Sequence, residues 1–176
     1  VVLREATRRA GVSPNAAYRH FADRSALVDA VSDAAAGRVA AAIETEWDAV
    51  PLGRPADETA REHLRAVGRG YLRFARDEPG LFRAAFTVPT DLHEAFDRAK
   101  AGPVGRTPFE LLATALDELV AAGPLPAERR PGAEFACWSA VHGLAMLVLE
   151  GPLRGLGPEF GRAAAQRVVE MAVRGI

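Results

Sequence analysis

Apolar residues recur every three or four positions along most of the chain, which is the spacing of an amphipathic helix. The spacing predicts helices over residues 3–10, 24–50, 57–76, 81–86, 91–100, 107–122, 134–150 and 158–175, with a further short one from residue 14. Proline and glycine separate most of these segments, and Asp57 is expected to cap the helix that follows it. No segment alternates as a strand does, so the sequence predicts an all-α fold.

The first 24 residues hold two short helical patterns joined at Gly11. Ser13 can cap the second pattern, and Pro14 suits its first helical position. The second pattern carries side chains that can form hydrogen bonds outward, namely Asn15, Tyr18, Arg19 and His20. A short helix, a glycine turn and a second helix of this kind follow the plan of a DNA-reading helix-turn-helix.

Charge is unevenly distributed around this pair of helices. The whole chain has a net charge of −1, with 49% hydrophobic and 26% charged residues, as in an ordinary globular domain. Residues 1–24 carry five arginines against two acids (net +3), and residues 25–50 carry one arginine against five acids (net −4). A basic tip on an acidic stem fits a protein that touches DNA with one end, although chance clustering gives the same numbers in so short a stretch.

Other classes of protein find little support. Cys137 is the only cysteine, so no intramolecular disulfide can form, and a reducing, cytoplasmic compartment is expected. There is no signal peptide, and the longest nearly uncharged run, residues 135–149, is shorter than the roughly 20 residues of a membrane span. The four histidines are scattered without zinc-ligand spacing, and no phosphate-binding loop or nucleophile elbow occurs. We therefore expect no enzyme, no metal and no cofactor.

Residues 3–31, LREATRRAGVSPNAAYRHFADRSALVDAV, resemble the DNA-binding head of the TetR family of bacterial transcription regulators. The shared features are the Leu-Arg-Glu start, the Ala-Gly-Val turn and the Tyr-x-His-Phe end of the recognition helix. The stretch from Trp138 to Gly143 and the turn at residues 78–82 resemble the Trp-His-Gly type of ligand-binding and dimerisation domain. Family members have a further helix before the position of Leu3, and because this sequence begins at Val1 we expect that first head helix to be missing from it.

The resemblance implies an all-α homodimer. Residues 1–46 would form the helix-turn-helix DNA-binding domain with its connecting helix, and residues 47–176 the ligand-binding and dimerisation domain. The last two helices of each subunit would pair in a four-helix bundle. An unidentified small-molecule effector would release the protein from a near-palindromic double-stranded operator, and repression is the expected outcome.

Matching positions assign the DNA contacts. Asn15 could pair with adenine, Ala16 could touch a thymine methyl group, and Arg4 could reach a guanine or a phosphate. Tyr18 would also face base edges, but its main contacts would be to phosphate, as would those of Arg19, His20 and Arg24. Ser13 would be a further DNA-binding residue. The alternative makes Tyr18 a core aromatic and Asn15 a turn residue.

The second domain offers aromatic and bulky apolar residues that could line a ligand cavity, with two of them as polar handles: Tyr71, Phe74, Phe82, Phe86, Phe109, Leu112, Phe135, Trp138 and His142. Each of them could instead fill the core, and His142 could be a buried histidine held by a neighbouring hydrogen bond. Cys137 is expected to be a small core residue rather than a redox sensor. A helical small-molecule carrier without DNA binding is the alternative function, because it would share this domain.

Overall fold

The computed structural model describes residues 3–87 and 91–176, apart from the side chains at positions 3, 4, 14, 17, 87 and 92. These ranges are helical, with no strand, and confirm the predicted all-α fold. The α-helices are α1 Leu3–Arg9, α2 Pro14–Ala17, α3 Arg24–Asp48, α4 Ala56–Asp77, α5 Pro79–Thr87, α6 Pro108–Ala122, α7 Ala133–Leu149 and α8 Pro158–Gly175. Three short 3₁₀ segments join them, η1 Leu92–Phe96, η2 Arg98–Lys100 and η3 Ala127–Arg129.

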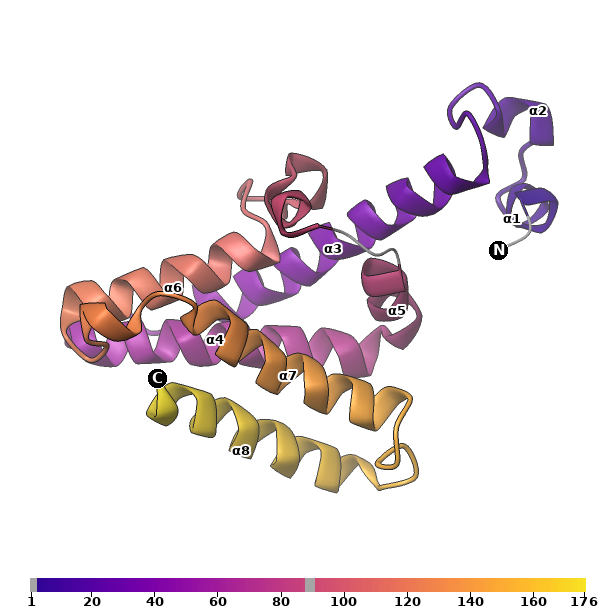
Figure 1. The fold of residues 1–176 in the computed structure, drawn as a ribbon. Helices are drawn as coiled ribbons and strands as arrows, with labels where there is room; N and C mark the ends of the chain where they lie inside the picture. Colours follow the sequence, from indigo (N-terminus) through magenta and orange to yellow (C-terminus); the bar gives the residue numbers. More distant parts are fainter. Residues whose placement is uncertain (1–2, 88–90) are drawn as a thin grey trace.

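Helix α3 connects two parts of very different size (Figure 1). The small head, formed by α1 and α2, lies at one end of α3 and away from the other helices. The body is built around α4, which packs on α3, α5, α6, α7 and α8. Helices α7 and α8 lie side by side and form one face of the body. The far half of α3 belongs to the body, because its residues Ala35, Val39 and Ile43 are buried in the common core.

Local sequence signals explain where several helices begin and end. The Asp23 carboxylate accepts a hydrogen bond from the Ala26 amide (2.9 Å) and caps α3. Thr107 caps α6 within a complete capping box with Glu110, and Gly123 closes that helix at a φ of 95°. The prediction that Asp57 caps α4 is wrong. The helix begins one residue earlier, at Ala56 after Pro55. The Asp57 carboxylate therefore lies in the first turn, where its negative charge interacts favourably with the helix dipole.

Two further elements differ from the predicted pattern. Residues 91–100 form η1 and η2 rather than one amphipathic helix. The break lies at Asp97, whose backbone is extended and whose side chain accepts from the Ala99 amide, an alternative to continuing the helix. In the head, α2 is a single turn ending at Ala17, so residues 18–20 lie in a turn after it.

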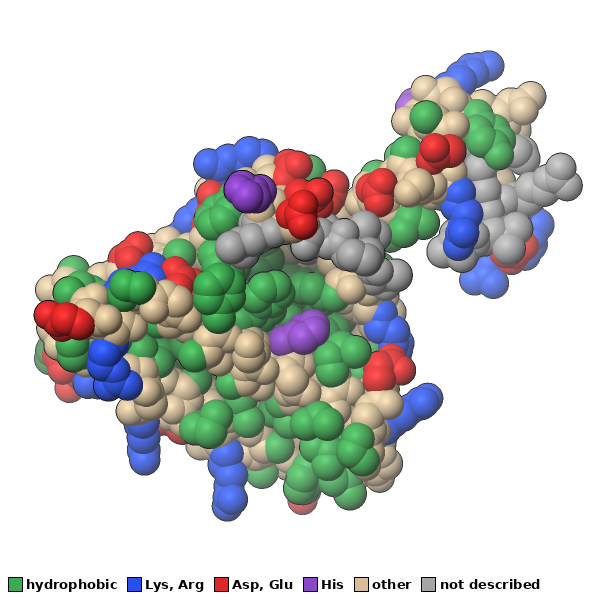
Figure 2. All heavy atoms as spheres, in the orientation of Figure 1, with side chains coloured by type: hydrophobic (Ala, Val, Ile, Leu, Met, Phe, Trp, Pro, Cys, Tyr) green, Lys and Arg blue, Asp and Glu red, His purple; other side chains and the backbone are tan. Residues whose placement is uncertain are grey.

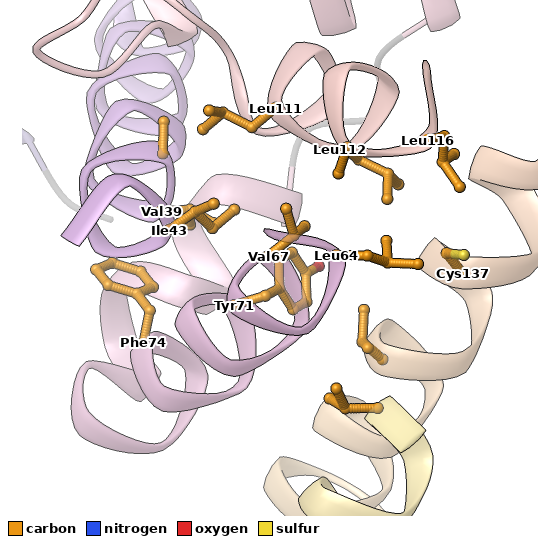
Figure 3. Packing of buried hydrophobic residues seen from close by; sticks show 14 of the residues in the cluster. Val39, Ile43, Leu64, Val67, Tyr71, Phe74, Leu111, Leu112, Leu116 and Cys137 are labelled. Atoms are coloured by element: carbon orange, nitrogen blue, oxygen red, sulfur yellow. The ribbon is translucent and has the colours of Figure 1, made fainter. Parts of the chain in front are cut away.

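The core is a single apolar cluster made by the body helices (Figure 3). Figure 3 shows side chains of α3, α4, α6 and α7 meeting there, with Val67 and Tyr71 of α4 near the middle. Glycine allows the helices to approach closely: a Cβ on Gly70 would lie 2.6 Å from the Ile43 Cα, and one on Gly68 would lie 2.7 Å from a Val169 methyl carbon. These contacts clamp α4 between α3 and α8.

Candidate functional site

The head presents most of the predicted DNA-contacting side chains to solvent. Those that are exposed are Ser13, Asn15, Tyr18, Arg19, His20 and Arg24, whereas Ala16 is half-buried. The Arg4 side chain lies outside the described residues. Tyr18 is 57% exposed and Asn15 lies within α2, which differs from the alternative of a core aromatic and a turn residue. The Ser13 hydroxyl accepts from the Ala16 amide (3.2 Å), as a helix cap does.

Two arginines of α1, Arg8 and Arg9, share one acidic partner on the same helix, Glu5. Glu5 accepts two hydrogen bonds from Arg8 (2.7 and 2.8 Å) and one from Arg9 (2.8 Å). These contacts lower the pKa of Glu5 below its ordinary value. These three side chains keep a net charge of +1, and Arg19 and Arg24 against Asp23 add a further +1 near the predicted phosphate contacts.

The body contains a half-open apolar cavity of about 110 Å³. Helices α3 to α8 all contribute to its wall, together with η1 and η2. Figure 2 shows hydrophobic side chains gathered in a hollow on this face of the body. Five of the predicted ligand residues line the cavity: Tyr71, Phe86, Phe109, Leu112 and Trp138. A concave, mostly apolar space with few polar groups is typical of a small-molecule site.

A hydrogen-bond chain runs along one side of this cavity. The indole N–H of Trp138 donates to the Tyr71 hydroxyl oxygen (3.3 Å), and that hydroxyl lies 2.8 Å from His142 Nδ1. Burial lowers the pKa of His142 and raises that of Tyr71, so both side chains are neutral at pH 7. Trp138 and His142 are four residues apart on α7, so one helix face brings both to Tyr71.

The other predicted ligand residues do not line this cavity. Phe82 is fully buried and His142 half-buried, and both rings pack against that of Phe86, with centroids 5.0 Å apart in each case. Phe74 is buried in the core, and Phe135 is 49% exposed on α7. His142 is thus a histidine held by a hydrogen bond to Tyr71, which lines the cavity.

Several wall residues carried no signal in the sequence. Ala36 and Ile43 of α3 and Val169, Ala172 and Val173 of α8 line the cavity, but each looks like an ordinary helix position in the sequence. Lys100 at the end of η2 also lines it and is only 9% exposed. A buried lysine is unusual, and its being the only lysine in the chain was the one available hint.

Helices α7 and α8 leave an apolar surface uncovered in the monomer. Exposed large side chains on these helices and the segment between them are Phe135, Met146, Leu147, Leu156, Phe160 and Met171. The buried residues of α7 lie on its other side. This is the surface that the sequence assigns to the homodimer, and an apolar surface of this kind often marks a protein interface.

Cys137 is a core residue, as expected. It is 5% exposed, and burial raises the pKa of its thiol to about 11. Within residues 3–87 and 91–176, no helix is long and apolar enough to cross a membrane. The same described residues contain no group of three or more histidine, cysteine, aspartate or glutamate side chains placed to hold a metal ion.

Comparison with known proteins points to one family. The family described as "Tetracyclin repressor-like, C-terminal domain" matches residues 64–172. The fold is similar to that of a protein of unknown function from Rhodococcus sp. RHA1, with a TM-score of 0.73 and 24% sequence identity over 100% of this chain and 84% of that one. At this identity the likeness concerns the fold alone. The comparison with curated proteins gives no match.

Proposed function

This chain belongs to the TetR (tetracycline repressor-like) family of regulators, and we propose that it is a homodimeric repressor that binds a near-palindromic operator and leaves it when a small apolar ligand binds. Residues 1–46, which comprise the head and most of the connecting helix α3, would form the DNA-binding domain, and residues 47–176 would bind the ligand and the second subunit. The protein would act in the cytoplasm and would not be an enzyme. The alternative remains a helical ligand carrier that does not bind DNA.

The observation that carries this proposal is the position of α3. One end of this helix holds the head, and Ala36 and Ile43 on the same helix form part of the cavity wall. A change in the cavity therefore acts directly on the helix that carries the head. A carrier without DNA binding would need neither this connection nor an exposed set of hydrogen-bonding side chains at its tip.

DNA selection tests the proposal. The purified protein, incubated with a random pool of duplexes at fixed salt, is expected to enrich a near-palindromic sequence, because two heads related by a two-fold axis read inverted half-sites. Affinity for that sequence should fall steeply with salt, because phosphate contacts release counterions. No enriched palindrome would favour the carrier, and a salt-independent affinity would contradict the phosphate contacts.

Two variants of the head separate base from phosphate contacts. Asn15→Ala should relax the preference at one base position of each half-site. Arg24→Ala should weaken binding to all sequences about equally and reduce the salt dependence. If both variants changed the selected sequence in the same way, these assignments would be wrong.

The homodimer is tested by mass in solution. A dimer is expected at micromolar concentration, and a charged residue in place of Met171, which is 59% exposed on α8, should convert it to a monomer. The same change at Leu52, which is 99% exposed and lies between α3 and α4, is the control. A monomeric wild-type protein would refute the dimer.

A further inference from the structure

The cavity wall contains one charged side chain in an otherwise apolar lining. Of the described residues around the cavity, Lys100 alone carries a charge. Its ammonium nitrogen lies 2.9 Å from the Asp33 Oδ1 on α3. An ammonium removed from water needs an anionic partner, so Asp33 offsets the desolvation of Lys100.

The two partners of this ion pair are unequally buried. The Lys100 side chain is 11% exposed, whereas that of Asp33 is 27% exposed. If a second anion reached Lys100 from the cavity, the Asp33 carboxylate could turn toward water at little cost. Lys100 has no such route, because it lies between the cavity and α3. The pair is therefore arranged so that the aspartate can be replaced.

The other polar groups of the cavity are already engaged. The Tyr71 hydroxyl is hydrogen-bonded to His142 Nδ1, and its oxygen accepts from the Trp138 indole N–H. Burial keeps Cys137 a neutral thiol, which is a weak hydrogen-bond partner. A polar group on a ligand would find its strongest partner at Lys100, and a negatively charged group would gain most, because a charge-assisted hydrogen bond is about twice as strong as a neutral one.

From these contacts we infer that the ligand is a small apolar molecule ending in a carboxylate, and that this carboxylate displaces Asp33 from Lys100. The inference rests on the proposed ligand-binding function and names the class of ligand. The apolar part would lie among Phe86, Phe109 and Leu112. The cavity of about 110 Å³ is smaller than the closed cavity of about 150 Å³ that takes up benzene, but it is half-open, so it suits a short chain or a single ring that extends into its opening.

The displacement would reach α3 because the segment after η2 lies directly on that helix. A Cβ added to Gly37 would lie 2.9 Å from the Ala101 carbonyl oxygen. A Cβ added to Gly102 would lie 2.9 Å from both carboxylate oxygens of Glu44 on the same face of α3. The exchange at Lys100 removes an ion pair at the head-proximal end of this contact. Binding thus loosens α3 where it leaves the body toward the head.

Calorimetry with matched ligands tests the inference. The probes are 3-phenylpropionate and 3-phenylpropionamide, together with hexanoate and hexanamide, titrated into the purified full chain at pH 7.5 without DNA. Each acid has nearly the size and shape of its amide but carries a charge. In the wild-type protein, at least one acid should bind at least about tenfold more tightly than its amide.

Two variants assign the preference to the ion pair. Lys100→Met should remove the preference for the acid, so that acid and amide bind with affinities within about threefold of each other. Asp33→Asn should strengthen acid binding severalfold, because the competing carboxylate is gone while lysine remains. A purely structural ion pair predicts weaker or unchanged binding for Asp33→Asn. Arg98→Met, on the same short segment but with a side chain 73% exposed, is the control and should leave the preference intact.

The outcome decides between the explanations. Equal affinities for acid and amide in the wild-type protein, no binding of either acid, or a preference that survives in Lys100→Met would each overturn the inference. If Lys100→Met does not fold, the wild-type ratio and Asp33→Asn still decide. Because no DNA is present, a failed operator selection leaves this result standing, and a failed acid preference leaves the operator result standing.

Discussion

The hydroxyl group of Tyr71 links α4 to α7 through hydrogen bonds, and its removal tests how much this hydrogen-bond chain beside the cavity contributes to stability. Replacing Tyr71 with phenylalanine removes one oxygen atom and keeps the ring. The packing of that ring against Phe82 (centroids 5.2 Å apart) and Phe86 (5.9 Å) is retained, so no cavity is created. What is lost is the hydrogen bond to His142 and the acceptor of the Trp138 N–H.

The expected loss follows from these two hydrogen bonds. A typical intramolecular hydrogen bond contributes about 0.5–1.5 kcal/mol, and leaving a buried partner unpaired costs about 1–3 kcal/mol. Both His142 and Trp138 are only half-buried, so water can replace part of what each loses. We therefore expect Tyr71→Phe to lower the free energy of unfolding by about 1–3 kcal/mol.

Urea unfolding at one fixed protein concentration measures this loss as a shift of the midpoint at an unchanged slope. Tyr18→Phe is the matched control, because that hydroxyl is on a ring that is 57% exposed in the head, and its effect should stay below about 0.5 kcal/mol. If Tyr71→Phe also stayed within about 0.5 kcal/mol of the wild type, the hydrogen-bond chain would not contribute to the stability of the body.

Three further predictions test other parts of the structure. Gly70→Ala should destabilise the protein by about 1–3 kcal/mol, because the added carbon would meet backbone atoms of α3. Gly143→Ala should be neutral or stabilising, because a Cβ at that position has no other atom within 4 Å. The reverse order of stability in urea unfolding would contradict this packing. Burial lowers the pKa of His142 from its ordinary 6.5, so the unfolded chain binds a proton that the native state does not, and stability should fall as the pH drops below about 6.5. When thermal unfolding is compared at pH 7.5 and pH 5.5, His142→Gln should lose less stability on acidification than the wild type. Equal losses would refute the assignment of this pH dependence to His142. Thr107→Val should lower the free energy of unfolding by about 1–2 kcal/mol, because it removes the N-cap of α6. Thr114→Val, in the middle of that helix, should change it little. Equal effects of the two substitutions would exclude a special role for the cap.

Local patterns were sufficient for most of the fold. The apolar spacing located every long helix, because the same face of each helix must be buried wherever it packs. Proline, glycine and caps such as Thr107 act within a few residues, so the bounds of α6 and α8 are readable from the chain itself. The break at Asp97 was missed because a short side chain competing with the helix looks, in sequence, like an ordinary polar position.

The residues of the cavity could be predicted only in part. Large aromatic residues such as Phe109 and Trp138 indicate an apolar interior. The sequence does not distinguish those that line the cavity from those that, like Phe74, pack fully against neighbouring side chains. That distinction depends on the crossing of α4 with α3 and α8, which the close contacts of Gly68 and Gly70 allow.

The amino-acid sequence by itself determined that this protein is all-helical, belongs to the TetR family, and carries a hydrogen-bonding head on a long helix. Those properties follow from periodicity and from motifs of neighbouring residues. Only the tertiary structure decided that Lys100 is buried in the cavity wall and paired with Asp33, 67 positions earlier in the chain. An ion pair between residues so distant depends on how the helices pack, which no local pattern specifies.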